Sequence, residues 1–203
     1  RDVAPSRGLG DVYKRQQQVS IANETAVSTT SSGTSVAQAT AAASSSQNQS
    51  KYEANVASVA GKMDNRVIAA YQQLGFKLVV DPSVNYSGYF DARSRSITMK
   101  QIDDSVYHEL GHFLAFIAGN VDKTASFQSI FAAEKANVTA FNKAYVTQNA
   151  SEYFAESVKD YILNNASLKS TRPQTYAAVQ NALNQITDAQ IAKIQKIYGA
   201  FWN

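Results

Sequence analysis

The stretch Val106–Phe116 (VYHELGHFLAF) contains both histidines of the 203-residue chain, four positions apart, with Glu109 beside the first. When residues are placed at steps of about 100°, the large apolar side chains of this stretch gather on one side. His108 and His112 then lie together on roughly the opposite side, one turn apart. The pattern predicts an amphipathic helix that carries two imidazoles able to chelate one metal ion, with a glutamate next to them as a general base.

A surface helix with two solvated histidines is the alternative reading of this stretch. In a chain of this length a chance H-E-x-x-H has a probability of roughly one per cent or less. The motif also uses both histidines of the chain, which favours zinc over chance. The chain contains no cysteine, so it lacks the usual ligands of a closed structural zinc site. Two histidines and one carboxylate would leave the open coordination position of a catalytic site.

The first sixteen residues are set apart from the rest. The run Ser6–Gln16 resembles the in-frame translation of a sequencing-library adapter, so we expect residues 1–16 to be non-native and the natural N-terminus, with any signal peptide, to be missing. Without them the chain has 19 − 4 = 15 basic and 16 − 2 = 14 acidic residues, a net charge of +1. That charge, with no basic cluster among aromatic residues, predicts no nucleic-acid binding. The longest apolar run, FLAFIA, is too short to span a membrane.

Residues 17–51 are rich in Ser, Thr, Ala, Gln and Asn and contain almost no large apolar side chain. Such a composition cannot bury enough surface to offset chain entropy, which predicts a disordered low-complexity linker. A degraded helical region is the alternative, because alanines are frequent. Residues 52–203 are long enough for one domain with its own core, which we expect to be the catalytic domain.

The pattern of residues 52–203 predicts an α+β domain, mostly helical with a small mixed sheet. Apolar residues at helical spacing from Val59 to Leu74 predict a first helix that ends at Gly75. Two strand candidates, FKLVVDP and SITMK, flank a turn-rich segment (NYSGYFDARSRS). After the histidine helix, we expect helices near 126–136 and 150–163 and two terminal helices, with Thr187 and Gln190 as a capping box for the last.

The third zinc ligand must be a carboxylate, because a third histidine is absent. Glu134 has nearly the spacing of thermolysin-like enzymes, but the position four residues later, where those carry an acidic residue, is Val138. Glu152 and Glu156 lie one turn apart on the polar side of their helix and could provide one ligand and one acceptor for a histidine ring. Asn149–Glu152 also fits a helix capping box, which leaves a capping role for Glu152 open. The downstream acidic candidates are Asp122, Glu134, Glu152, Glu156 and Asp160.

A family resemblance rests on two motifs and one tyrosine. HELGH, the motif EYFAE that begins forty residues after His112, and Tyr145 seven positions before Glu152 resemble the catalytic domain shared by anthrax lethal factor and secreted Pro-Pro endopeptidases. The resemblance covers roughly residues 51–203 and implies a zincin-like metallopeptidase of the gluzincin type that uses Zn²⁺. It implies that His108, His112 and Glu152 are the zinc ligands. It also implies that Glu109 is the general base, that Tyr145 stabilises the transition state, and that Glu156 lies beside the ligands without binding the metal itself.

The resulting hypothesis is a zinc-dependent endopeptidase that acts on extended segments of proteins or peptides. The resemblance suggests proline-rich segments, and with the linker it suggests a secreted or cell-surface protein; we expect a monomer. Two alternatives stay open: a non-catalytic surface-binding module with a relic metal site, against which Glu109 argues, and a toxin-type peptidase domain that acts in a target cell.

Two features bear on how a substrate would lie. SITMK is predicted either as the edge strand that pairs with an extended peptide or as an interior strand without that role. The aromatic residues Tyr86, Tyr89 and Phe90 could line a pocket for proline, but ordinary packing is the favoured reading of each.

Overall fold

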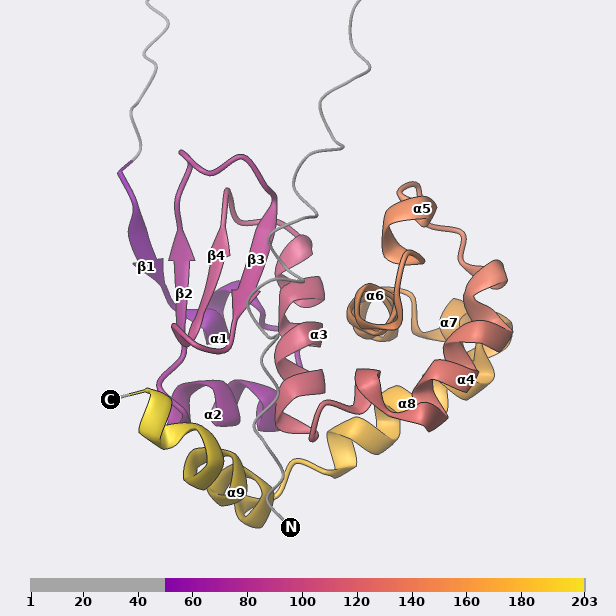
Figure 1. Ribbon diagram of the computed structural model, residues 1–203. Coiled ribbons are helices and arrows are strands. Elements are labelled where there is room, and N and C mark those ends of the chain that lie inside the picture. Colours follow the sequence, from indigo (N-terminus) through magenta and orange to yellow (C-terminus); the bar gives the residue numbers. More distant parts are fainter. Residues whose placement is uncertain (1–49, 203) are drawn as a thin grey trace, which may run out of the picture. The chain divides into compact units, whose positions relative to one another are not determined.

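The computed structural model describes residues 50–202, whose arrangement Figure 1 shows. A small sheet lies on one side, a group of helices lies on the other, and the histidine helix α3 (Ser105–Ile117) stands between them. The predicted adapter-derived segment (1–16) and residues 17–49 of the predicted linker lie outside the described residues. The helix with the H-E-x-x-H motif is therefore covered on two sides, by strands and by helices.

Four short strands form the sheet in the order β1-β2-β4-β3. They are β1 (Tyr52–Ala54), β2 (Lys77–Val80), β3 (Gly88–Asp91) and β4 (Ser96–Met99). β2 and β4 run parallel, whereas β1 pairs antiparallel with β2, and β3 pairs antiparallel with β4. A small mixed sheet in a mostly helical domain confirms the predicted α+β class.

The sequence predicted two of the four strands. FKLVVDP contains β2 and SITMK contains β4, because both are rich in β-branched and large apolar residues. β3 lies in the segment predicted to be turn-rich, since glycine and aspartate are poor strand residues. Only the loop after β3 is a turn, where the Asp91 carboxylate accepts the N–H of Arg93 at 2.8 Å. The edge-strand reading of SITMK is wrong, because β4 is interior and the edge beside α3 is β3.

Helices make up the rest of the domain. α4 and α6 lie where the sequence predicted helices, and within residues 50–202 no helix combines the length and apolarity needed to cross a bilayer. Three single 3₁₀ turns follow α3, α4 and α9. Besides α3, the helices are α1 (Val56–Val59), α2 (Asn65–Gln73), α4 (Ala125–Glu134), α5 (Lys143–Val146), α6 (Ala150–Leu163), α7 (Asn165–Thr171), α8 (Pro173–Asn184) and α9 (Asp188–Tyr198).

The first predicted helix is interrupted. α1 ends at Val59, and α2 begins after Asp64, whose side chain accepts the N–H of Arg66 at 2.9 Å. The apolar spacing continues across this break, so periodicity alone joined the two helices. Gly75 has a φ of +72°, as expected of the residue that follows a helix C-terminus.

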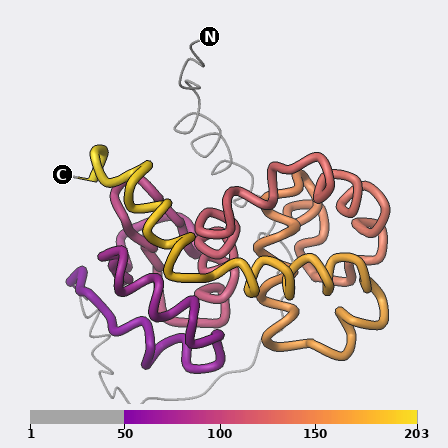
Figure 2. The backbone as a smooth tube through the Cα atoms, turned by 90° about the horizontal axis from the view of Figure 1, so that it is seen from below, coloured from indigo at the N-terminus to yellow at the C-terminus, as the bar shows by residue number. Residues whose placement is uncertain are grey.

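The last helix and the residues that follow it are bonded to the end of α3 and to the loop after β3. Thr187 caps α9 by accepting the N–H of Gln190 at 3.2 Å, as predicted. The Gln190 side chain, however, donates from Nε2 to the carbonyl of Ile117 at 2.8 Å and ties α9 to the end of α3. Trp202 Nε1 donates to the carbonyl of Ala92 at 2.9 Å, next to the sheet. Figure 2 shows the α8–α9 stretch running along one side of the domain, from the helical half to the sheet half.

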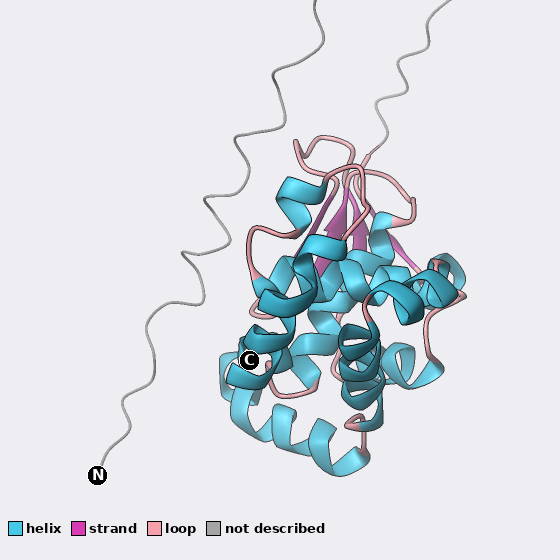
Figure 3. Ribbon diagram, turned by 90° about the vertical axis from the view of Figure 1, so that its right-hand side faces the viewer, coloured by secondary structure: helices cyan, strands magenta, loops and turns pink. Residues whose placement is uncertain are grey.

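α3 is buried on both of its sides, from Val106 to Ile117. Toward the sheet, the ring centroid of Phe113 lies 4.9 Å from that of Phe76 and 6.2 Å from that of Phe90. The opposite side of α3 packs against α6, and Figure 3 shows helices in front of the strands. The alternative of a surface helix with solvated histidines is therefore wrong, because another helix covers the histidine side.

Candidate metal centre

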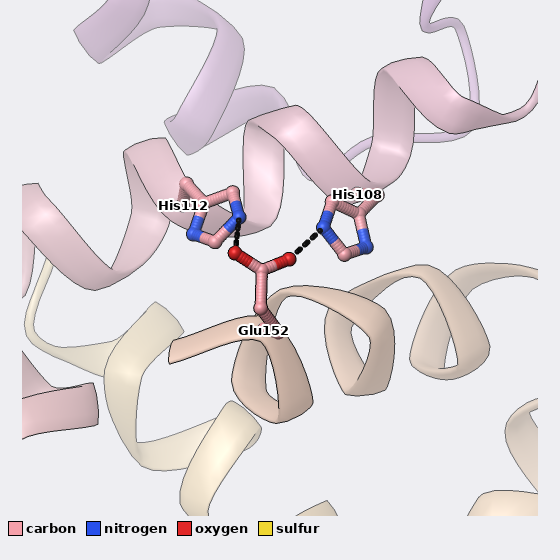
Figure 4. Close-up of side chains that lie close together, drawn as sticks. All are labelled: His108, His112 and Glu152. Carbon is pink, nitrogen blue, oxygen red and sulfur yellow. Dashed lines mark hydrogen bonds and ion pairs between the residues drawn. The ribbon is translucent and has the colours of Figure 1, made fainter. Parts of the chain in front are cut away.

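The three side chains that could hold a metal ion come from α3 and α6, which pack directly against each other (Figure 4). His108 Nε2 lies 3.1 Å from Glu152 Oε2, and His112 Nε2 lies 3.7 Å from Glu152 Oε1. One ligand atom from each of the three residues lies within 4.8 Å of the others. All three side chains are buried, with exposed fractions of 7%, 7% and 3%. Among the described residues, this is the one group of three or more such side chains that could hold a metal ion.

The spacing of these atoms fits a zinc ion. Tetrahedral zinc has bonds of about 2.0–2.1 Å to nitrogen and oxygen, which puts its ligand atoms about 3.3 Å from one another. The separations from His108 Nε2 to Glu152 Oε2 and from His112 Nε2 to Glu152 Oε1, 3.1 and 3.7 Å, lie on either side of that value, with one carboxylate oxygen facing each ring. Two imidazoles and one carboxylate are also the donor set of one class of catalytic zinc site.

The N-terminus of α6 explains how Glu152 is free to face the histidines. Asn149 accepts the N–H of Glu152 at 2.9 Å through its side chain, so it caps the helix as predicted. The carboxylate of Glu152 does not complete a capping box but turns toward His108 and His112. The capping motif and the ligand position therefore coexist, because they use different groups of Glu152.

Glu156 forms a hydrogen bond with His108 on the side of the ring opposite Glu152. Its Oε2 lies 2.8 Å from His108 Nδ1, so it accepts that N–H and leaves Nε2 free to face Glu152. The other carboxylate oxygen of Glu156 lies 3.4 Å from Lys159 Nζ, a partly exposed cation one turn further along α6. The ring orientation of His108 is thus fixed from the side away from Glu152.

The site has a strongly negative character. Burial lowers the pKa of His108, but hydrogen bonds to Glu152 and Glu156 outweigh it and raise that pKa to about 10. Burial also opposes ionisation of Glu152, yet its hydrogen bonds with the histidines hold the pKa of that carboxyl well below its usual range. Groups that stabilise an imidazolium so strongly also stabilise a divalent cation in the same place.

Glu109 lies beside the two histidines and close to the edge strand β3. It is 6% exposed, and burial raises the pKa of its carboxyl, with the two histidine charges acting in the opposite direction. The N–H of Phe90 on β3 forms a hydrogen bond with this carboxyl. A Cβ on Gly88 would lie 2.6 Å from Glu109 Oε1 and 2.7 Å from its Cγ, so only glycine leaves room for this side chain. A buried carboxyl with a raised pKa is suited to accept and release a proton.

Tyr145 reaches the site from the short helix α5. Its ring centroid lies 6.4 Å from that of His108, and its side chain is 43% exposed. Burial of the phenol, together with the charge of Glu152 and a hydrogen bond to it, raises the pKa of Tyr145. The phenol therefore keeps its proton and can donate it in a hydrogen bond.

The other acidic candidates have different partners. Glu134 accepts the N–H groups of Gln174 and Thr175 at 3.0 and 2.9 Å and caps α8. Asp122 accepts a hydrogen bond from Ser151, and Asp160 forms an ion pair with Arg172. None of these three belongs to the group of residues that could hold a metal.

The three aromatic residues before β4 separate into two kinds. Phe90 is buried, and its ring is stacked near that of His112, with centroids 6.5 Å apart. Its packing role is clear. Tyr86 and Tyr89 are partly exposed, with ring centroids 5.8 Å apart. Burial raises the pKa of each phenol, and the charge of Glu109 adds a smaller effect in the same direction. These two tyrosines are therefore the ones that lie where a bound ligand could touch them.

Sequence reasoning missed three residues that shape this site. Gly88 and Gly111 matter through the absence of a Cβ, and Lys159 through its contact with Glu156. Gly111 stands inside the H-E-x-x-H motif, and Lys159 follows Glu156 at a helical i,i+3 spacing, so both could have been noticed. The role of Gly88 depends on a contact between β3 and α3, which a local sequence pattern cannot predict.

Two comparisons with known proteins each cover a part of this chain, and the family match includes the part that contains this site. Residues 92–182 match the family model described as "Anthrax toxin lethal factor, N- and C-terminal domain". A curated Pro-Pro endopeptidase of Clostridioides difficile (strain 630) is 41% identical over 78 residues, which cover 36% of this chain and 34% of the relative. The resemblance to the lethal factor and Pro-Pro endopeptidase family is confirmed. The match spans about a third of the length of that relative, and the matched residues 92–182 run from before α3 into α8 and include every predicted site residue.

Proposed function

We propose that residues 52–203 form a zincin-like domain that acts as a zinc-dependent endopeptidase. The observation that carries this proposal is the convergence of His108, His112 and Glu152 on one position, with Glu109 beside them. The family resemblance and the name of the curated relative support a peptidase. A non-catalytic surface-binding module would have no use for a buried, proton-accepting glutamate next to the ligands.

The chemistry divides among the side chains of the site. When bound, zinc would polarise the scissile carbonyl and favour attack by water at neutral pH. Glu109 takes the proton of the attacking water and delivers it to the leaving amine. Tyr145 donates a hydrogen bond to the oxygen on which negative charge develops. Glu156 keeps His108 in the orientation that its Nε2 needs.

The outer edge of β3, where the Phe90 N–H already bonds to the Glu109 carboxyl, is the proposed place for an extended substrate. Lys100 N donates to the carbonyl of Ser87 at 2.9 Å. Because hydrogen-bonded and non-bonded pairs alternate in an antiparallel ladder, the main-chain groups of Gly88 and Phe90 point away from β4. An extended peptide that adds to this edge would pass next to Glu109, which supports an endopeptidase. The sequence suggested SITMK as the strand that pairs with a substrate, and we propose β3 for that role instead.

The name of the curated relative suggests segments with consecutive prolines as substrates. A role outside the cell, as a secreted or cell-surface monomer, fits such substrates and the predicted linker. A toxin-type peptidase that acts in a target cell is a second candidate, because the matching family model is described by a toxin.

Cleavage of a peptide library is the direct test of this function. The 203-residue chain should cleave peptides varied on both sides of the scissile bond, and a chelator should abolish cleavage until zinc is restored. We expect enrichment of proline on both sides, since proline lacks the N–H and fixes φ in a way that an aromatic-walled site can accept. A broad hydrophobic preference would contradict the proposed specificity only. Cleavage that is indifferent to chelators, or no cleavage, would contradict the zinc peptidase.

Replacement of Gly88 by alanine should slow turnover without weakening zinc binding. The new Cβ would lie 2.6 Å from Glu109 Oε1 and would displace that carboxylate, and the three nearest atoms that it meets all belong to Glu109. A misplacement on the order of 1 Å can cost about 10²-fold in rate. Steady-state kinetics and a zinc titration check this. Gly199→Ala is the control, because its Cβ would meet nothing within 4 Å; unchanged kcat in Gly88→Ala would show that the glycine does not position the base.

A further inference from the structure

Gly111 lies where α3 and α6 come closest. A Cβ built on Gly111 would lie 2.7 Å from the Cα of Ala155 and 2.7 Å from its carbonyl oxygen. Real Cβ atoms essentially never approach other atoms within 3.0 Å. Ala155 is fully buried and carries the smallest side chain that a helix interior normally uses. The main chains of the two helices therefore touch at this point, with no side chain of Gly111 between them.

The contact is placed at the centre of the metal site along both helices. Gly111 directly precedes the ligand His112, and Ala155 stands between Glu152 and Glu156. The distance between two packed helices depends on the size of the side chains at their crossing. The same contact thus acts on the separation between the imidazole nitrogens and the Glu152 oxygens, 3.1 and 3.7 Å.

We propose that the contact between Gly111 and Ala155 sets the spacing of the three metal ligands, which makes Gly111 a positioning residue of the metal centre. The inference rests on the proposed zinc site. Ordinary van der Waals contact begins near 3.4 Å, so an alanine at 111 would require a shift of 3.4 − 2.7 = 0.7 Å. Metal–ligand distances tolerate deviations of only about 0.2 Å. The shift therefore exceeds what the zinc geometry accepts.

The surrounding packing directs this shift into the spacing between α3 and α6. The atoms that the new Cβ meets belong to the main chain of Ala155 and cannot rotate away as a side chain would. On the other side, α3 cannot retreat, because Leu110 and Phe113 are fully buried against the rest of the core. The main chain of α6 is held in its helix, and the hydroxyls of Tyr153 on α6 and Thr175 on α8 lie 2.7 Å apart and bond the two helices to each other.

A wider spacing should change which ion the site prefers. Ligands held further apart suit a larger ion better than a smaller one, since each ion needs its own bond length. Cd²⁺ is larger than Zn²⁺ and uses the same kinds of ligand. A change in the ratio of the zinc and cadmium affinities therefore reports ligand spacing, which a general loss of stability would not alter.

The experiment compares Gly111→Ala with the wild-type chain and with Gly61→Ala. The control adds a methyl at a glycine whose Cβ would find its nearest neighbour, the Ala57 carbonyl oxygen, at 3.7 Å. Dissociation constants for zinc and for cadmium are measured by competition with a coloured chelator, and folding is followed by circular dichroism. We expect the zinc affinity of Gly111→Ala to fall by at least about 10-fold, the cost typical of disturbed ligand support. Cadmium affinity should fall less, and Gly61→Ala should match the wild type.

The possible outcomes separate this inference from the proposed function. A wild-type chain that binds neither ion would remove the zinc site, and the inference with it. Wild-type zinc binding that Gly111→Ala retains, or loses in the same proportion as cadmium binding, would overturn the inference alone. If Gly111→Ala is unfolded without metal, each ion is titrated into it. A ratio of the cadmium to the zinc concentration needed for folding that is lower than the ratio of the two dissociation constants of the wild type supports the inference. An equal or higher ratio, or no folding, overturns it.

Discussion

Replacement of Glu109 by glutamine should abolish most peptide cleavage while zinc binding remains. General acid–base groups contribute about 10²–10⁴-fold to rates, and we expect a loss of kcat in that range. Glutamine has nearly the shape of glutamate but cannot accept a proton from water at neutral pH. Zinc affinity should be unchanged, because Glu109 is not one of the three residues whose ligand atoms converge. Single-turnover kinetics with a peptide substrate and a zinc titration measure the two quantities.

The same variant should fold at least as stably as the wild type. Burial raises the pKa of Glu109, which means that the ionised carboxyl is disfavoured where it stands. Burial of the ionised carboxyl costs folding free energy, so its removal should leave the melting temperature unchanged or raise it. Glu53→Gln is the matched control, since Glu53 is exposed and pairs with Lys77 on the far strands of the sheet. Full turnover by Glu109→Gln would mean that another group acts as the base.

Local sequence patterns predicted those parts of the site that depend only on helical spacing and on helix caps. The H-E-x-x-H spacing placed His108, His112 and Glu109 on one side of one helix, because helical geometry follows from sequence distance alone. The caps at Asn149 and Thr187 were predicted for the same reason. Helix-face geometry also brought Glu152 and Glu156 forward, but Glu152 could be distinguished from a capping residue only when α6 was seen against α3.

Features that depend on contacts between distant elements could not be predicted. The polar side of α3 was expected to face away from the core. In the structure that side is also buried, because it packs against α6. β3 escaped notice because Gly88 and Asp91 are poor strand formers, and tertiary pairing with β4 overrode that preference. The glycine at 88 makes sense only once Glu109 is seen next to it. A glycine whose role is to leave room for another side chain does not appear in the hydrophobic periodicity of the sequence.

Replacement of Glu152 by alanine should remove most of the zinc affinity, whereas Glu134→Ala should not change it. Glu152 provides the only carboxylate oxygens near both imidazoles, at 3.1 and 3.7 Å among the described residues. Residues that merely support ligands are worth about 10–100-fold in metal affinity, so loss of a ligand should cost more than about 100-fold. The dissociation constant of zinc, measured by chelator competition, checks both variants.

Glu134→Ala should instead show its effect in stability. The Glu134 carboxylate accepts the N–H groups of Gln174 and Thr175 and the hydroxyl of Thr175, the last at 2.7 Å. Removal of this cap leaves polar groups without their partner inside the protein, which costs about 1–3 kcal/mol. Thermal unfolding of the metal-free variants should therefore show a lower melting temperature for Glu134→Ala than for the wild type, with normal zinc uptake once folded. If Glu134→Ala lost zinc and Glu152→Ala kept it, the ligand assignment taken from α6 would be wrong and a thermolysin-like spacing would be correct.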